Sequence, residues 1–206
     1  MINRAELKQL SKQQIKGNIG TLFVCYLIII AISAVIGALN FIPFLGMIAS
    51  ILVTPALSLG LIIIYLGITN GKKAEIADLF KGFNQYVNVI VLYVLVAVFT
   101  MLWSLLLVIP GIIKAYSYSM SFYILAEHPE MSAREALNES KAMMVGHKWE
   151  FFVLQLSFIL WGLLGAITLG IAYIWIAPYM TTTYTNYYHA IKRINVEPVV
   201  ETATQE

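Results

Sequence analysis

The chain has 206 residues, of which 60% are hydrophobic and 12% charged, with a formal net charge of +2. This near-neutral balance, without a basic patch, argues against nucleic acid as a partner. The mean hydropathy is +0.80, and three stretches without any Asp, Glu, Lys, Arg or His hold 125 of the 206 residues: 17–71, 82–113 and 151–188. A charge at the centre of a bilayer costs about 2.5–3.5 kcal/mol, so the sequence predicts an integral membrane protein rather than a soluble domain.

A basic segment precedes the first apolar stretch. Arg4, Lys8, Lys12 and Lys16 are spaced four residues apart, which places them on one side of a helix. Such a stripe can attract anionic lipids at about 1 kcal/mol for each basic residue, or it can serve only to set the topology. The apolar stretch that follows is longer than the core of a signal peptide, about 7–15 residues. We therefore expect an uncleaved first crossing.

The apolar stretches have the length and the residue pattern of membrane helices. One helical crossing takes about 20 apolar residues, and the alternation that barrel strands require is missing. Breaker residues at 40–43, 110–111 and 168–170 indicate turns. We predict an all-α membrane protein of six transmembrane helices arranged as three hairpins. The expected spans cover residues 19–39, 46–69, 86–109, 111–127, 150–168 and 170–190.

Six spans give a consistent topology. They place twelve of the thirteen basic residues on one side, and Lys114 alone falls near an outer turn. The positive-inside rule makes the basic side cytoplasmic, so both termini are expected in the cytoplasm of an inner-membrane protein. Residues 1–192 form one polytopic domain in this prediction, and the short acidic tail at 193–206 is expected to be disordered.

A possible internal repeat accompanies the spans. Gly17, Gly82 and Gly146 are 65 and 64 residues apart, and each lies between a short charged segment and an apolar hairpin. Coincidence in an apolar sequence is the alternative explanation. If the repeat is real, the three units are residues 1–71, 72–127 and 128–192.

A capping box marks the start of one short helix. Ser132 occupies the N-cap and Glu135 the third helical position, so each side chain can bond the backbone N–H at the other position. The helix should run to about Val145 and stop at Gly146. Its apolar side chains share one face, which predicts an amphipathic connector on the inner membrane surface or against the bundle, with partner docking as the functional alternative.

Polar residues return in the fourth and sixth expected spans, where each forms a stripe. In lipid such stripes should face the protein interior. They predict either hydrogen-bonded contacts between helices or a polar substrate cavity, and Lys114 could instead extend to the outer headgroups. The candidate seam consists of Lys114, Ser117, Tyr118, Ser121, Thr182, Thr185 and Asn186.

Catalytic patterns are missing from the sequence. It contains no paired-histidine zinc motif, Walker loop or Gly-x-Ser-x-Gly elbow. Glu127, His128 and Glu130 are close in sequence, but Pro129 favours a solvated loop over a metal site. The single cysteine, Cys25, lies within the first span. We therefore expect no catalytic residue, no cofactor and no metal.

A set of short motifs is spread along the chain. The motifs are Pro110-Gly111-x-x-Lys114-Ala115-Tyr116, Glu127-x-Pro129, Ser132-x-x-Glu135-Ala136-Leu137, Ser140, Gly146-x-Lys148, Leu156-Ser157-Phe158-x-x-Trp161 and Pro178-Tyr179. With these motifs the chain resembles a bacterial integral-membrane family catalogued as domain of unknown function 975. The resemblance covers roughly residues 1–192 and implies no activity. More loosely, the chain resembles the membrane domain attached to some glycerophosphodiester phosphodiesterases, whose chemistry resides in a separate soluble domain.

Together these features predict an inner-membrane protein without catalytic activity, acting as an accessory, scaffold or regulatory component. Its partners would be lipids, including anionic ones at the N-terminal basic stripe, and a membrane protein or a second copy of the chain. The alternative is a small transporter, channel or lipid-handling protein that uses the polar seam between helices four and six.

Overall fold

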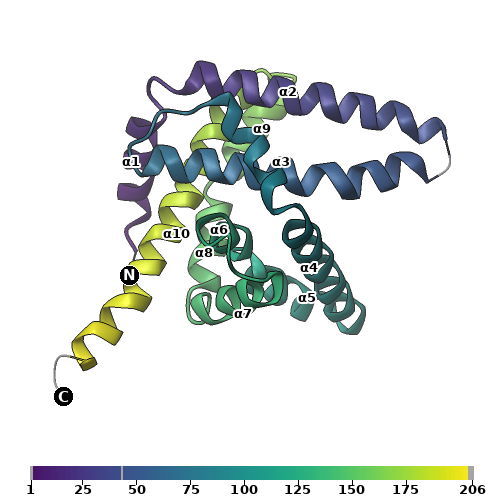
Figure 1. The fold of residues 1–206 in the computed structure, drawn as a ribbon. Helices are drawn as coiled ribbons and strands as arrows, with labels where there is room; N and C mark the ends of the chain where they lie inside the picture. The colour runs from purple at the N-terminus through teal and green to yellow at the C-terminus, as the bar shows by residue number, and fades with distance from the viewer. Residues whose placement is uncertain (1, 43, 204–206) are drawn as a thin grey trace.

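The computed structural model describes residues 2–42 and 44–203, with side chains described as far as Asn195. Every regular element in this described part is a helix (Figure 1). In chain order the elements are α1 (Arg4–Gln14), α2 (Ile19–Ala38), η1 (Leu39–Phe41), α3 (Leu45–Thr69), η2 (Ile76–Gln85), α4 (Tyr86–Leu106), α5 (Val108–Tyr118), α6 (Ser121–Glu127), α7 (Ala133–Met143), α8 (Lys148–Leu156), α9 (Ile159–Ile167) and α10 (Tyr173–Ala203); η1 and η2 are 3₁₀ helices.

Among the residues that the structure describes, four helical stretches are long and apolar enough to cross a membrane. They are Ile19–Phe41, Leu45–Thr69, Ile76–Leu106 and Lys148–Ile167. Each overlaps one of the expected spans one, two, three and five. The prediction of an all-α protein with membrane-spanning helices is thereby supported at this coarser level.

The expected fourth and sixth spans differ from the other four. The fourth is divided into α5 and α6, which are only 11 and 7 residues long. The sixth is part of α10, whose residues 181–189 are rich in threonine and tyrosine. Neither is among the stretches that length and composition select, so a count of six spans stays a prediction.

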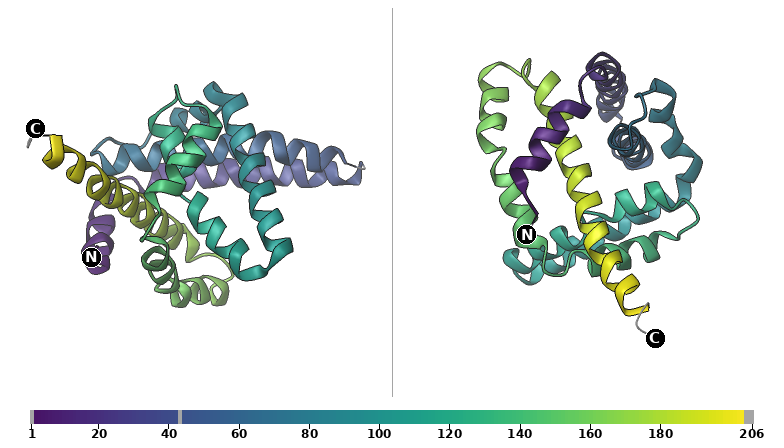
Figure 2. Two further views of the ribbon diagram at one scale, coloured as in Figure 1. Left: turned by 90° about the horizontal axis from the view of Figure 1, so that it is seen from below. Right: turned by 90° about the vertical axis from the view of Figure 1, so that its left-hand side faces the viewer.

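The helices do not form one parallel bundle. α2 and α3 lie side by side as a long hairpin, and Figure 1 shows them projecting beyond the rest of the molecule. The right-hand view of Figure 2 looks along this hairpin. In that view α4, α8–α9 and α10 are seen from the side, so they run at an angle to α2 and α3. The arrangement as three hairpins stays a prediction.

The core surrounds α10, which packs against α1, α2, α3, α7 and α9. Its fully buried members come from elements far apart in the sequence, because the apolar faces of α3, α4, α6 and α7 all turn toward the same centre. Among them are Leu59, Leu92, Ile124, Ala136 and Ile191. A second cluster joins the first half of α2 to α3 and η2 through Leu22, Cys25, Ile64 and Leu79.

The far half of the α2–α3 hairpin lies outside this core. In α2 only Leu22 and Cys25 are buried, and near the tip Phe41 and Phe44 are 93% and 73% exposed. Large aromatic side chains at such exposure are costly in water, at about 25 cal/mol for each Å² of apolar surface. A lipid or protein environment removes that cost.

Two short helices share one local structure. α1 and α7 are both 11 residues long, and each starts at a residue whose side chain accepts hydrogen bonds from the first turn, Asn3 or Ser132. Each is followed by a four-residue turn containing a left-handed glycine, Gly17 (φ 86°) or Gly146 (φ 79°). Glycine favours this conformation because it has no Cβ.

Gly82, the remaining glycine of the proposed repeat, has a different structural role. It lies inside η2 and is not among the glycines with positive φ. A Cβ at Gly82 would clash with the carbonyl oxygen of Ala56 in α3. Its role is the close contact between η2 and α3, so the local similarity extends to the first and third units only.

The C-terminal segment continues α10. The helix extends to Ala203, whereas the sequence favours a disordered tail over 193–206. Side chains after Asn195 and all of residues 204–206 lie outside the described part, and the separation of a tail from the domain stays a prediction.

Candidate functional site

A hydrogen-bonded polar cluster joins α1, α3 and α10. The Asn186 side-chain amide donates to Ser11 Oγ at 2.9 Å and to Gln14 Oε1 at 2.6 Å. Gln14 Nε2 in turn donates to the Thr69 carbonyl oxygen at 3.3 Å. Thr69 Oγ1 lies 3.0 Å from His189 Nε2. Polar groups from three distant segments therefore satisfy one another in the interior.

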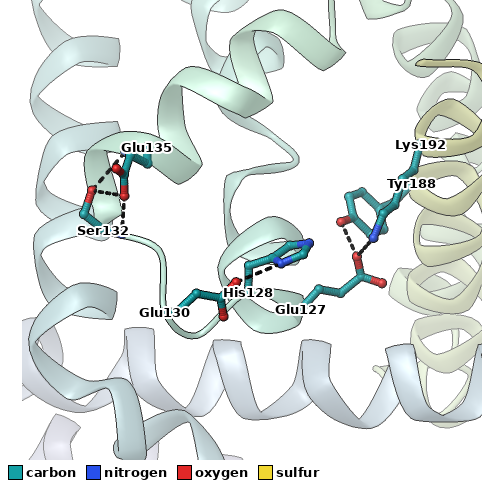
Figure 3. Close-up of polar contacts among 7 residues, drawn as sticks. All are labelled: Glu127, His128, Glu130, Ser132, Glu135, Tyr188 and Lys192. Carbon is teal, nitrogen blue, oxygen red and sulfur yellow. Dashed lines mark hydrogen bonds and ion pairs between the residues drawn. The ribbon is translucent and has the colours of Figure 1, made fainter. Parts of the chain in front are cut away.

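A second polar contact joins α6 to α10. Glu127 accepts hydrogen bonds from the Tyr188 hydroxyl at 2.6 Å and from the Lys192 ammonium (Figure 3). The Tyr123 ring stacks on Tyr188 with centroids 5.3 Å apart. Glu127 is therefore part of a helix contact, although the sequence suggested a solvated loop. His128 and Glu130 do form an exposed pair, with Nδ1 and Oε1 3.1 Å apart.

Two cavities adjoin these clusters. One, of about 470 Å³, lies between α1 and α10, where Gln14, Asn186, His189 and Arg193 are among the lining residues. The other, of about 530 Å³, is lined in part by Lys72, Lys73, Lys81, Glu75, Asp78 and Glu127. Asn70, directly after α3, lines both. The ends of α3, α6 and α10 thus meet at one polar region.

The seam residues of the fourth expected span contact partners outside α10. Lys114 is half-buried, with Nζ 4.6 Å from the Trp103 ring centroid. Ser117 and Ser121 donate to carbonyl oxygens three or four residues earlier in the chain, at 3.0 and 2.7 Å. Tyr118 is buried and packs near Phe99.

A side chain of α7 bonds the free backbone groups at the break between α5 and α6. Ser140 Oγ donates to the Ser117 carbonyl oxygen at 2.8 Å and accepts from the Met120 N–H at 3.2 Å. Ser140 is fully buried. One hydroxyl thus satisfies two backbone groups that the interrupted helix leaves free. The sequence placed Ser140 on the apolar face of α7 but gave no sign of this role.

Two of the three seam residues of α10 form hydrogen bonds with other partners. Thr185 donates to the Thr181 carbonyl oxygen at 2.9 Å, and Asn186 bonds α1. Thr182 is fully buried, and its Oγ1 makes no hydrogen bond within the described residues. Tyr123 and Glu127, which the seam did not include, contact Tyr188 of α10.

The predicted capping box is confirmed. Ser132 Oγ accepts from the Glu135 N–H at 3.3 Å, and Glu135 Oε2 accepts from the Ser132 N–H at 2.8 Å (Figure 3). The bonds that the Ser132 N–H and the Ser132 hydroxyl donate to the Glu135 carboxylate lower the pKa of Glu135. The predicted amphipathic face is also present, since Ala133, Ala136, Leu137, Ser140 and Met143 are buried. Within residues 2–42 and 44–203, no three His, Cys, Asp or Glu residues could together hold a metal ion.

The fold and this region define an all-α protein with helices suited to a membrane and a polar centre around α10. The model of the family described as "Protein of unknown function (DUF975)" matches residues 1–114 and 104–195, so the chain belongs to that family. No curated protein and no solved structure matches the chain. The family predicted from the motifs is confirmed, while the likeness to phosphodiesterase membrane domains stays a prediction.

Proposed function

We propose that this chain is a non-catalytic protein of the cytoplasmic membrane that acts as an accessory or scaffold component. In this proposal its α2–α3 hairpin receives a transmembrane helix of a partner protein. The observation that carries the proposal is a groove of about 390 Å³ between the far halves of α2 and α3. Those halves make few contacts with the remainder of the described chain.

The groove has the chemistry of a helix-packing surface. In membranes, small residues let two helices approach closely, and hydroxyl groups form bonds between helices. A Cβ at Gly37 would meet nothing within 4 Å, so this side of α2 is open to a neighbour. The lining residues are Ser33, Ile36, Gly37, Asn40, Gly46, Met47, Ser50, Ile51 and Thr54.

The polar groups of α10 favour a structural role over a transport pathway. Asn186 is bonded to α1 and Tyr188 to Glu127. Thr183 and Thr185 donate to carbonyl oxygens one turn earlier in their own helix. Groups already bonded within the fold must lose those bonds before they can bind a solute. We regard the bonds of Asn186 and Tyr188 as contacts that hold the helices together.

The proposal includes six crossings with both termini in the cytoplasm. It is supported by the basic residues, since Lys72, Lys73 and Lys81 line one cavity and Arg193 lines the cavity beside it. A reporter fused after Arg193 tests it: cytoplasmic reporter activity is expected, and an external reporter would overturn the six-span topology.

Cysteine crosslinking in membranes tests the docking surface. In a Cys25→Ser background, single cysteines replace Ser33 and Met47 in the groove. The control is Leu105→Cys on α4, where the native side chain is 72% exposed. We expect crosslinks to a partner from the groove positions only. A chain that purifies alone in mild detergent and gives no crosslink would refute the proposal.

Filling the groove gives a matched pair of variants. Gly37→Leu should abolish copurification of the crosslinked partner by occupying the groove. Gly20→Leu, also on α2 and also free of neighbours within 4 Å, should leave it intact. Equal effects from both would indicate that the groove is not the docking surface.

The alternative is a small transporter or lipid-handling protein. The cavity lined by Asn186, His189 and Arg193 favours it, because its polar groups could hold a small solute. His189→Ala and Arg193→Ala variants that fold normally test this alternative, because both residues line the cavity. Unchanged solute flux and lipid-resistance phenotypes in both would count against it.

A further inference from the structure

One side of α1 carries basic residues without acidic partners. Arg4, Lys8 and Lys12 lie one helical turn apart, and none of them is in an ion pair among the described residues. Burial lowers the pKa of Lys8, and the charges of Arg4 and Lys12 lower it further. The surroundings of Lys8 therefore lack a counter-charge.

The two lysines lie against the aromatic surface of α9 and α10. α1 is placed between α8–α9 and α10, as the right-hand view of Figure 2 shows. Lys8 Nζ is 4.4 Å from the Phe158 ring centroid and 3.5 Å from the Ser157 carbonyl oxygen. Lys12 Nζ is 5.4 Å from the Tyr179 ring centroid.

An apolar slot opens beside Lys12. Its volume is about 180 Å³, and its lining residues are Lys12, Ile15, Trp161, Trp175, Ile176 and Tyr179. Trp161 and Trp175 are 38% and 55% exposed. Tryptophan and tyrosine concentrate at the level of lipid headgroups, where one end of the ring is apolar and the other wet. The slot thus combines the positive charge of Lys12 with an otherwise apolar and aromatic lining.

The depth of the lysines strengthens the need for an anion. In the six-span prediction, Phe158 and Tyr179 lie within spans five and six. Amines that reach this level leave the aqueous layer, and a charge in such a place needs a counter-ion. The aromatic rings meet part of that need through cation–π contacts.

We propose that Lys8 and Lys12 together bind the phosphate of an anionic phospholipid, with the start of an acyl chain in the slot. Both ammonium groups donate hydrogen bonds to the phosphate oxygens, and the aromatic side chains contact the chain. The site rests on the proposed membrane location. A phospholipid is preferred over free phosphate because only the lipid also fills the apolar slot.

The second short helix provides an internal comparison. Lys141 stands in α7 as Lys12 stands in α1, one residue after the buried serine. It is only partly buried, and its ammonium donates to Asn138 Oδ1 at 3.2 Å. The cation–π contacts of the described residues do not include it. Lys141→Gln is therefore a control for the loss of one surface charge.

Quenching of tryptophan fluorescence tests the site directly. The full chain, with Trp103→Phe and Trp149→Phe, retains only the two tryptophans of the slot. It is reconstituted in phosphatidylcholine vesicles that contain either brominated phosphatidylglycerol or brominated phosphatidylcholine. We expect a relative binding constant about 30-fold higher for phosphatidylglycerol, as two basic residues at the membrane surface would give.

The lysine variants distinguish a specific lipid-binding site from general electrostatic attraction to anionic lipids. Lys8→Gln with Lys12→Gln should bring the ratio of the binding constants for phosphatidylglycerol and phosphatidylcholine close to one. Lys8→Arg with Lys12→Arg should keep the ratio of the parent chain. Lys141→Gln should leave it unchanged. No preference in the parent chain, a preserved preference in the glutamine variant, or an equal loss in Lys141→Gln would each overturn the proposal.

Extraction of native membranes with carbonate separates this proposal from the membrane assignment. If the chain stays in the membrane pellet and lacks the lipid preference, only the lipid site is wrong. If the chain is released by carbonate, the membrane assignment is wrong as well. Unchanged circular dichroism in the variants confirms that they fold.

Discussion

The side-chain amide of Asn186 donates a 2.9 Å hydrogen bond to the hydroxyl of Ser11, although the two residues are 175 positions apart in the chain. The bond lies in the interior, since Ser11 is fully buried and Asn186 only 5% exposed. It fastens the N-terminal helix to α10, the centre of the core. Stability should therefore depend on this pair more than on any exposed polar contact.

Asn186→Leu should destabilise the protein by about 1–3 kcal/mol, because Ser11 and Gln14 lose a buried donor. Bonds between helices in a membrane average only about 0.6 kcal/mol, which favours the lower part of that range. Thermal unfolding in detergent measures the effect. Asn138→Ala removes only an exposed contact to Lys141 and should be close to neutral; equal losses in both variants would contradict the prediction.

Gly82→Ala should destabilise the packing of η2 on α3 by about 1–3 kcal/mol, because the added methyl group overfills a tight contact. The carbonyl oxygen of Ala56 stands where the methyl would be. Gly20→Ala is the matched control, since no atom lies within 4 Å of its Cβ position. Thermal unfolding should show a loss for Gly82→Ala and none for Gly20→Ala, and a neutral Gly82→Ala would refute the close contact.

Ser140→Ala should cost about 1–3 kcal/mol, because the Ser117 carbonyl and the Met120 N–H both lose their partner in a buried place. Hydrogen exchange should increase at Met120 before it increases elsewhere in α5 and α6. Ser50→Ala, in the exposed half of α3, should leave exchange at Met120 unchanged. Unchanged protection at Met120 in Ser140→Ala would mean that the hydroxyl does not stabilise the backbone between α5 and α6.

Glu135 should make the start of α7 sensitive to acid. Its pKa in the fold is lowered, first by the Ser132 N–H and then by the Ser132 hydroxyl. The contribution of its charge is thus complete above the unfolded value of about 4.3 and is lost as the pH falls through the lower, folded value. Hydrogen exchange of the first α7 amides should show less protection below about pH 4.

Glu135→Gln is the control for that pH dependence, because glutamine also completes a capping box but does not titrate. The difference in protection between the native chain and this variant should change with pH across the acidic range. A constant difference would show that the carboxylate does not stabilise the helix start.

Lys114→Met should change stability by less than about 1 kcal/mol, the value of an exposed cation–π contact. Its ammonium faces Trp103 and not the polar cluster of α10. Thermal unfolding and membrane yield measure the effect. A loss comparable to that of Asn186→Leu would indicate that Lys114 belongs to the polar interior after all.

Features that depend on neighbouring residues could be predicted. The capping box of Ser132 and Glu135 is a contact over three positions, and its residue types define it. The helix end before Gly146 follows in the same way, since the left-handed turn there needs a glycine. The division of the fourth expected span was missed, because it depends on Ser140 from another helix.

The candidate polar seam was predicted less well. The sequence correctly indicated that Thr182, Thr185 and Asn186 lie inside the protein, since all three are buried. It assigned them to contacts with the fourth span, yet Asn186 bonds Ser11 and Gln14. Neither Ser11 nor Gln14 was among the candidate residues, because a helix periodicity shows which residues share a face but not which helix that face meets.

The sequence by itself determined which segments are long and apolar enough to cross a membrane, because the cost of placing a charge or a leucine in lipid or water depends on the residue and hardly on its partners. It likewise determined the helix caps and glycine turns, which are bonded within a few positions. Only the tertiary structure decided that α10 is the central helix, that Glu127 meets Tyr188 and Lys192, and that Lys8 and Lys12 reach an aromatic slot. Those contacts depend on the path of the chain between distant segments, and many paths would satisfy the same pattern of apolar and polar residues.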